Sequence, residues 1–311
     1  MHICYDIRKI QIQTFDRPVI TMGSFDGVHI GHRRILERVV EAARSAGRKS
    51  ILVTYHPHPR TVLAPGTPFK LLTLLEEKIA LMESLGMEEM VVLNFDQGLA
   101  NTEARQFVDE ILVGKLSPSR IIVGYDHGFG RKRLGGVELL QEAGNIHGFE
   151  VEVIQPVRIN GQEISSSKIR KAFQAGNFNS GVNLLGHTYP LTGTVKMGTG
   201  LGRKLGYPTC NLVVAEEKLL PPQGIYSCRV RIDSDLKSGM AYIGSRPTVE
   251  STGELAVEVH ILDFEGVLYD RAIRLELEEW VRPDRKFEKI DQLKIQIQQD
   301  ERIIREKLKL T

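Results

Sequence analysis

Between residues 18 and 155, short β-branched runs alternate with amphipathic segments that repeat apolar residues at helical spacing. The predicted strands cover residues 19–22, 50–55, 90–95, 120–124 and 150–154. The predicted helices between them cover residues 33–46, 74–85, 103–113 and 137–146. This alternation predicts βαβ crossovers, and therefore an α/β fold with a doubly wound, mostly parallel sheet covered by helices on both faces. Such sheets bind ligands at the carboxyl ends of their strands.

The pattern changes near residue 185. Two short helical segments, residues 167–174 and 180–185, are followed by strand-like runs without intervening helices. These runs cover residues 191–196, 211–214, 225–232, 241–243, 255–262 and 272–278. They predict a small antiparallel barrel or sandwich, and the amphipathic segment 287–308 predicts a terminal helix packed on it. We therefore expect one domain over residues 1–185 and a second over residues 186–311.

The size and charge of the chain narrow the choice of partner. A length of 311 residues exceeds the size at which one hydrophobic core usually keeps growing, which agrees with two domains. The 41 Lys and Arg residues nearly balance the 39 Asp and Glu residues. This balance argues against a nucleic acid or a membrane surface as the partner, so we expect small molecules. The composition leaves open a weak association between copies of this chain.

The cysteines and the N-terminus bear on the compartment. Cys4, Cys210 and Cys228 lie far apart and form no C-x-x-C pair, which argues against a disulfide framework and against structural zinc. The N-terminus has no apolar signal-peptide core, and no run of about 18 apolar residues occurs. The sequence therefore predicts a cytoplasmic protein.

A glycine-rich segment, GSFDGVHIGH, joins the first predicted strand to the first helix. Free backbone N–H groups and the helix dipole attract anions at such a junction, so we expect Gly23, Phe25 and Asp26 in a phosphate-binding loop. His29 and His32 can both point into this pocket. Oriented imidazole N–H groups would stabilise the charge that develops when a nucleophile attacks the α-phosphorus of ATP.

A second polar cluster, ISSSKIR, lies where another helix should begin. Ser166, Ser167 and Arg170 could clamp the β- and γ-phosphates from the opposite side of the same pocket. The same serines would also serve as an N-cap of the helix. Both roles stay open for this cluster.

The strings FDGVHIGH and ISSSKIR resemble the adenylyltransferase domain of the prokaryotic bifunctional riboflavin kinase/FAD synthetase family. The string GYDHGFG after the fourth strand is similar to a loop of that family that contacts the nucleotide and the flavin. The resemblance implies that Asp126 and His127 lie on the flavin and substrate side. His127 stands where the family usually has phenylalanine, so this chain differs from the family in a side chain that is expected to pack against the flavin.

A second glycine-rich segment, GTVKMGTGLGRKLGYPTCN, follows the expected domain boundary. It matches neither the Walker pattern nor G-x-G-x-x-G. It could still cover phosphates as a flexible loop, with Gly198, Gly202 and Lys204 as the candidate contacts.

The end of this segment resembles the Pro-Thr-Ala-Asn motif of the family's riboflavin kinase domain, with Cys210 in place of alanine. The resemblance implies that Thr209 and Asn211 hold Mg²⁺ beside the ATP phosphates, and Mg²⁺ prefers such hard oxygen ligands. It also implies that Glu258 is the base that accepts the ribityl hydroxyl proton, a task for which a carboxylate is adequate. The string WVRPDRKF resembles the flavin-side loop, with Arg282 as its best match.

The resemblance covers about residues 15–308 and implies an enzyme that uses ATP twice. It would phosphorylate riboflavin to FMN with the help of Mg²⁺, and it would adenylylate FMN to FAD with release of pyrophosphate. Two alternatives stay open. The histidine pair also fits a nucleotidyltransferase for another phosphorylated substrate with an accessory barrel, and His127 leaves room for a flavin-binding regulator that has lost one activity. The Pro-Thr-Cys-Asn turn with Glu258 favours the enzyme, because an accessory barrel needs neither.

Overall fold

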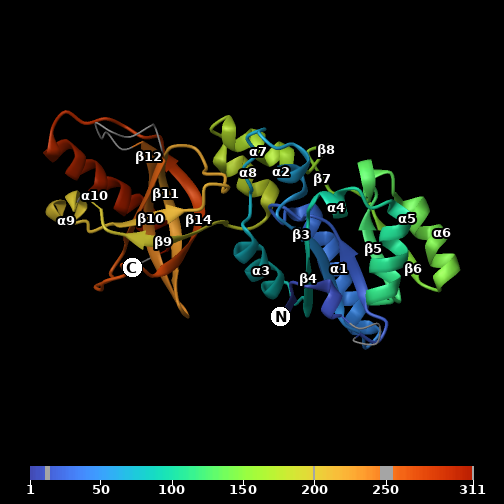
Figure 1. Cartoon of the computed structure of the whole chain (residues 1–311). Coiled ribbons are helices and arrows are strands. Elements are labelled where there is room, and N and C mark those ends of the chain that lie inside the picture. The colour runs from blue at the N-terminus through green and yellow to red at the C-terminus, as the bar shows by residue number, and fades with distance from the viewer. Residues whose placement is uncertain (11–14, 199, 246–254, 310–311) are drawn as a thin grey trace. The chain divides into compact units, whose positions relative to one another are not determined.

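The five strands expected in the first half of the chain form one parallel sheet with a sixth strand in the computed structural model (Figure 1). The structure describes residues 1–10, 15–198, 200–245 and 255–309. The strand order is β1-β4-β3-β2-β5-β6, and every neighbouring pair is parallel. The strands are β1 (His2–Cys4), β2 (Val19–Met22), β3 (Ser50–His56), β4 (Glu89–Asn94), β5 (Arg120–Gly124) and β6 (Glu150–Ile154). The edge strand β1 was not predicted, because three residues are too few to show a period.

Helices cover both faces of this sheet, because successive strand residues point to opposite sides. Val19 and Leu52 pack with the helices of one face, while their neighbours Ile20 and Ile51 pack with those of the other. The first face carries α1 (Ile30–Ser45) and α3 (Leu75–Ser84), and the second carries α5 (Ala104–Gln106), the π-helix η2 (Phe107–Leu116) and α6 (Val137–His147). Short helices η1 (Ile7–Lys9), α2 (Pro59–Leu63), α4 (Gln97–Ala100) and η3 (Arg131–Arg133) lie in the connections. The doubly wound α/β prediction is confirmed.

The second half of the chain forms a closed antiparallel barrel, which decides between the barrel and the sandwich. The order is β10-β13-β12-β11-β14-β9, and β9 pairs with β10 to close it. The strands are β9 (Tyr189–Lys196), β10 (Cys210–Val214), β11 (Gly224–Ile232), β12 (Asp235–Ser245), β13 (Leu255–Ile261) and β14 (Ala272–Arg282). Short helix α9 (Leu201–Leu205) lies between β9 and β10. The terminal helix α10 (Ile290–Lys307) packs Ile304 against Ile225 and Met240, as predicted.

Two helices that precede the barrel in sequence pack with it. Phe173 of α7 (Ser166–Gln174) and Phe178 of α8 (Phe178–Leu185) contact the rings of Tyr189 and Tyr226 at centroid distances of 4.8–6.4 Å. The chain accordingly divides into unit 1, Met1–Phe69 with Leu74–Ser165, and unit 2, Lys70–Thr73 with Ser166–Thr311. The hairpin of β7 (Arg158–Ile159) and β8 (Gln162–Glu163) ends unit 1. The domain boundary at residue 185 stays a prediction.

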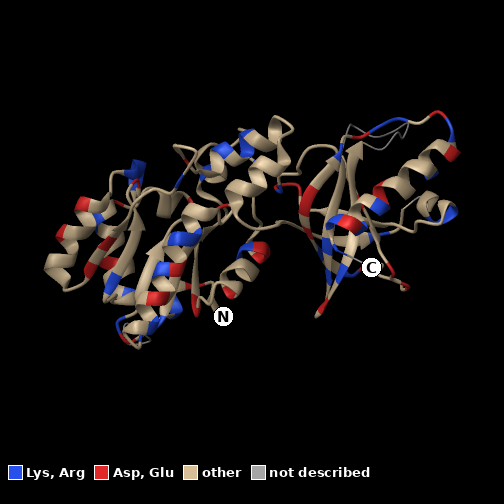
Figure 2. Cartoon of the chain, turned by 180° about the vertical axis from the view of Figure 1, so that it is seen from behind, with Lys and Arg blue, Asp and Glu red and all other residues tan. Residues whose placement is uncertain are grey.

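Basic and acidic residues are interspersed over the elements of both units, in keeping with the balanced composition (Figure 2). Among the helices that the structure describes, none combines the length and apolar character needed to cross a bilayer.

Candidate functional site

The loop that joins β2 to α1 holds four residues with positive φ: Gly23 (154°), Phe25 (46°), Gly27 (84°) and Val28 (42°). Glycine adopts such angles at little cost, but the left-handed conformation is unfavourable by about 1–2 kcal/mol for a residue with a side chain, as at Phe25 and Val28. Strain of this kind persists only where surrounding contacts hold it, and it collects at ligand-binding sites. The backbone therefore singles out the loop in which phosphate binding was predicted.

His29 caps the amino end of α1. Its Nδ1 accepts the backbone N–H of His32 at 3.2 Å, so the neutral ring carries its proton on Nε2. The two imidazole rings stack, with centroids 3.6 Å apart and planes inclined by 13°. Gly31 makes room for the pair, because a Cβ there would lie 3.2 Å from the His29 ring. The fold thus brings both predicted histidines together at a helix amino terminus.

A cleft of about 670 Å³ opens beside this loop, at the carboxyl ends of β2, β3 and β5. The predicted residues that line it are Gly23, Phe25, His32, Asp126 and His127. Asp26 and His29 do not line it and are buried, with 3% and 5% of their surface exposed. The rest of the lining combines apolar side chains with the basic residues Arg60, Arg131, Lys132 and Arg133. These basic residues were not predicted to line the site, although Arg131, Lys132 and Arg133 are consecutive in the sequence. Apolar walls with a basic rim suit a flat aromatic ligand that carries phosphates.

The imidazole of His32 is neutral at pH 7. Burial is the largest cause, and the neighbouring His29 and Lys78 add to it, so the pKa of His32 lies well below 6.5. Its Nδ1 is buried and has no hydrogen-bond partner among the described residues. A polar atom in this state is costly unless a ligand or water satisfies it, which supports a ligand-binding role for the ring.

The ring of His127 lies on the wall of the same cleft, 5.7 Å from the ring of Phe129. Burial, with a smaller effect of Arg133, lowers the pKa of His127 to about 4, so the ring is neutral at pH 7. Its Nε2 is buried without a partner in the described part of the chain. The wall of the cleft therefore carries a buried nitrogen that only a ligand or water can satisfy.

A buried lysine beneath the loop was missed. Lys78 of α3 is 5% exposed, and its Nζ donates to the Ser24 carbonyl at 2.6 Å and to Thr54 Oγ1 at 3.3 Å. Burial lowers the pKa of Lys78 to about 8, although Asp26 acts in the opposite direction. A signal was present, because position 78 follows Leu74 by four residues and precedes Met82 by four, on the apolar stripe of the helix.

The predicted phosphate clamp lies in α7 of unit 2. Ser166 and Ser167 begin this helix, and Arg170 Nε donates to the Lys70 carbonyl at 3.1 Å. The phosphate-binding role of the three residues stays a prediction.

In the barrel, Thr209, Asn211 and Glu258 come together. Thr209 Oγ1 donates to Glu258 Oε2 at 3.3 Å, and Asn211 is the direct partner of Glu258 in the β10–β13 ladder. Directly opposed residues of antiparallel strands point to the same face. Val257 and Val259 are buried while Glu258 is half-buried, as the predicted alternation of this strand requires. One face therefore carries a hydroxyl, an amide and a carboxylate in mutual reach.

The glycine-rich segment packs directly on this trio. A Cβ at Gly198 would lie 1.9 Å from Asn211 Nδ2, and a Cβ at Gly202 would lie 2.3 Å from the Tyr207 carbonyl and 3.1 Å from Thr209 Oγ1. Both glycines are thus required by close approach to residues of the predicted site. Lys204, the third predicted residue of this segment, is exposed on α9.

Arg282 forms a buried ion pair. Its Nε and Nη2 donate to Asp300 Oδ1 and Oδ2 at 2.8 and 2.6 Å, and Gln296 Nε2 donates to the same carboxylate at 3.0 Å. Asp300 lies on α10 and is 0% exposed, so the pair joins this helix to β14. Asp300 was missed, although it falls on the apolar stripe between Ile297 and Ile304. Flavin contact by Arg282 stays a prediction.

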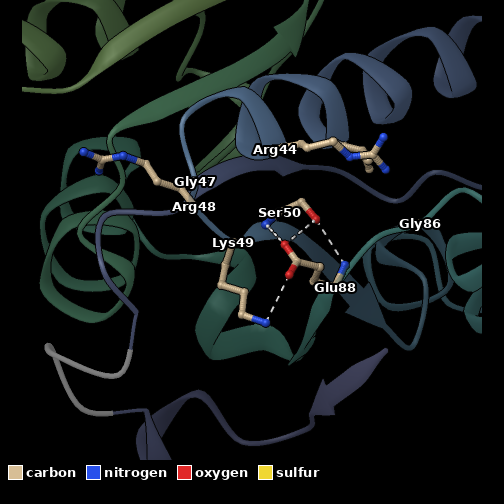
Figure 3. Close-up of a pocket in the computed structure, with 8 residues that line it drawn as sticks. Arg44, Gly47, Arg48, Lys49, Ser50, Gly86 and Glu88 are labelled. Atoms are coloured by element: carbon tan, nitrogen blue, oxygen red, sulfur yellow. Dashed lines mark hydrogen bonds and ion pairs between the residues drawn. The ribbon is translucent and has the colours of Figure 1, made fainter.

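A second cavity of about 450 Å³ lies at the amino ends of β3 and β4 (Figure 3). The Glu88 carboxylate accepts the Ser50 N–H at 3.1 Å and pairs with Lys49 at 3.1 Å. Arg44 and Arg48 extend away from this carboxylate in Figure 3. The polar groups at its centre satisfy one another, and ligands of parallel sheets bind at the other end of the strands.

Family models match both parts of the chain. The model described as FAD synthetase matches residues 11–168, and the model described as riboflavin kinase matches residues 185–308. Among curated proteins, relatives named bifunctional riboflavin kinase/FMN adenylyltransferase occur in Pseudomonas fluorescens and Escherichia coli. The first is 39% identical over 91% of this chain and 90% of its own length, and the second is 35% identical over 94% and 93%.

A solved structure matches over nearly the whole chain. It is a protein from Streptococcus pneumoniae described as a macrolide-efflux protein, with 30% identity and a TM-score of 0.85 over 97% of this chain and 98% of that one. The two proteins therefore share the fold of both units.

Proposed function

The chain belongs to the family of bifunctional riboflavin kinase/FMN adenylyltransferases, and from this premise we propose that its two units divide the two reactions between them. Unit 2 transfers the γ-phosphoryl group of ATP to riboflavin, which yields FMN and ADP. Unit 1 transfers the adenylyl group of a second ATP to FMN, which yields FAD and pyrophosphate.

The stacked histidines at the amino end of α1 carry the proposal for unit 1. A phosphate oxygen of FMN attacks the α-phosphorus of ATP, and negative charge increases on the oxygens of the α-phosphate until pyrophosphate leaves. His32 is a neutral N–H donor on the wall of the cleft, the buried ring of His29 stacks on it, and the helix dipole adds positive potential. A donor of this kind contributes about 3 kcal/mol of transition-state stabilisation. No covalent intermediate with the protein is needed.

The cluster of Thr209, Asn211 and Glu258 supports the kinase reaction in the barrel. The terminal ribityl hydroxyl of riboflavin must lose its proton as it attacks the γ-phosphorus, and Glu258 is the base that accepts it. Thr209, which donates to Glu258 at 3.3 Å, holds the carboxylate in place before substrate binds. Gly198 and Gly202 let the backbone of the loop lie against this face, where phosphates would bind.

The donor set of the barrel fits Mg²⁺. The hydroxyl of Thr209 and the side-chain oxygen of Asn211 are hard ligands next to a carboxylate, and Mg²⁺ is usually held by one or two protein ligands together with substrate phosphates. In keeping with such a sparse site, the described residues contain no group of three or more His, Cys, Asp or Glu side chains that could hold a metal alone. When bound, Mg²⁺ would neutralise charge on the ATP phosphates.

Its use of ATP and flavins as substrates, together with three free cysteines, supports a cytoplasmic location. Small molecules are then its expected partners, since acidic and basic residues are interspersed on both units.

Product analysis of the intact protein tests the proposal. With riboflavin, ATP and Mg²⁺ we expect FMN and then FAD on chromatography. His32→Ala should lower FAD formation about 100-fold or more while FMN still forms. Glu258→Gln should stop FMN formation while supplied FMN is still converted to FAD.

Two other outcomes would favour the alternatives. Tight FMN binding without any FAD would indicate a regulator. Adenylylation without any riboflavin phosphorylation would indicate a nucleotidyltransferase with an accessory barrel.

A further inference from the structure

We infer that Lys78 is a positioning residue for adenylyl transfer: its ammonium group holds the strained histidine loop through the Ser24 carbonyl. This inference rests on the proposed function of unit 1. Lys78 does not line the cleft, so it acts through the loop and not by touching substrate.

The geometry ties three elements together at one nitrogen. Lys78 Nζ comes from α3, donates to the carbonyl of Ser24 in the loop at 2.6 Å, and lies 3.3 Å from Thr54 Oγ1 on β3. Thr54 Oγ1 in turn donates to the same carbonyl at 3.5 Å. Ser24 lies between Gly23 and Phe25, both of which have positive φ. The lysine therefore holds the loop directly beside Phe25, one of its two strained residues.

A hydrogen bond alone does not explain a lysine here. A neutral donor could satisfy a carbonyl, whereas a buried ammonium group is costly and lysine is almost never fully buried unless it is paired. Asp26, from the same loop, is the acidic group that acts on Lys78, and it is itself buried. The position therefore carries a charge at a cost to stability, as expected where function requires that charge.

The charge of Lys78 also favours the neutral form of His32, as a smaller contribution than burial. Burial is the largest cause of the low pKa of His32, followed by the neighbouring His29 and then by Lys78. A neutral His32 keeps one N–H donor and one lone pair, which suits a ring that binds a phosphate oxygen beside another imidazole. Because the pKa of Lys78 is about 8, the lysine is protonated at neutral pH and loses its charge as the pH rises further.

The experiment compares Lys78→Met, which removes the charge, with Lys78→Arg, which keeps it. Lys115→Met is the matched control, because Lys115 is a half-buried lysine of unit 1 that also donates to a backbone carbonyl, that of Ile10 at 3.3 Å. FAD formation from supplied FMN is followed from about pH 6 to about pH 10, with FMN formation by the same molecule as the internal reference. The titration of His32 is read by NMR of labelled histidine, a signal that does not depend on turnover.

We expect Lys78→Met to lower FAD formation about tenfold or more and to move the titration of His32 to higher pH. Lys78→Arg should keep the low pKa of His32 and restore part of the rate. It should also lack the decline above about pH 8 that we expect of the wild type, because a guanidinium group stays protonated. Lys115→Met should match the wild type in every readout.

FAD formation by Lys78→Met at the wild-type rate, or an alkaline decline that persists in Lys78→Arg, would overturn the inference. If Lys78→Met does not fold, the inference is still tested by comparing the pH profile of FAD formation in Lys78→Arg with that in the wild type. A wild type that makes no FAD would instead contradict the proposed function, and the NMR titrations would still test the link between Lys78 and His32.

Discussion

One methyl group added at Gly198 should stop the barrel from phosphorylating riboflavin while leaving the barrel folded. In Gly198→Ala the new Cβ would lie 1.9 Å from Asn211 Nδ2, whereas ordinary contact begins at 3.4 Å. The Asn211 amide must therefore retreat by about 1.5 Å, and a displacement of about 1 Å at a reacting site can cost about 100-fold in rate.

The substitution should leave the barrel folded. The atom that has to move is the end of a side chain, so the backbone of β10 can stay in register. Because Asn211 is only 7% exposed, the amide moves against packed neighbours, and overpacking of this kind costs about 1–3 kcal/mol. We expect FMN formation to fall about 100-fold and thermal unfolding to remain cooperative.

Gly200→Asn is the matched control in the same loop. No atom lies within 4 Å of a Cβ at Gly200, and asparagine tolerates its left-handed backbone (φ 74°). Riboflavin phosphorylation is followed by chromatography, and conversion of supplied FMN to FAD serves as the reference for both variants. FMN formation in Gly198→Ala within about threefold of that in Gly200→Asn would refute the reasoning, because it would mean that displacing Asn211 does not matter.

Three further changes test the buried polar groups. His127→Phe removes a buried nitrogen without a partner and should raise the free energy of unfolding by about 1 kcal/mol in urea titrations; a loss of stability would contradict this account. The pKa of Lys78 is lowered from 10.5 to about 8, so the unfolded chain binds the extra proton between these pH values, and wild-type stability should rise by about 3 kcal/mol across that window. Lys78→Met should lack this rise, and equal pH dependences in the two proteins would argue against a buried ammonium group. Asp300→Asn leaves Arg282 without its charge partner and should destabilise the barrel by about 3 kcal/mol in urea, whereas Arg302→Gln, at an exposed ion pair of the same helix, should change stability by about 0.5 kcal/mol or less. Equal effects of these last two changes would mean that burial of the pair is unimportant.

The local pattern of the chain was enough to predict most elements. Strands β2, β5 and β6 begin and end at the predicted residues, because a buried parallel strand is a short apolar run with clear ends. The residue types of the two sites were also visible, since His29 and His32 stand in one short string and Thr209 and Asn211 in another. Burial periods and short motifs are properties of neighbours in sequence, so the sequence alone determines them.

The contacts between distant segments were decided only by the tertiary structure. Closure of the barrel depends on β9 meeting β10 and β14 at once, and the packing of α7 and α8 on the barrel depends on four aromatic rings from separate segments. Lys78 under the loop, Asp300 under Arg282 and Gly198 against Asn211 are pairs separated by 13 to more than 50 residues. From its sequence neighbours alone, Lys78 or Asp300 would be taken for a solvent-exposed charge on a helix, and Gly198 for a flexible loop residue. Only the fold brings the partners within bonding distance, and the desolvation and close contact that result give these residues their roles.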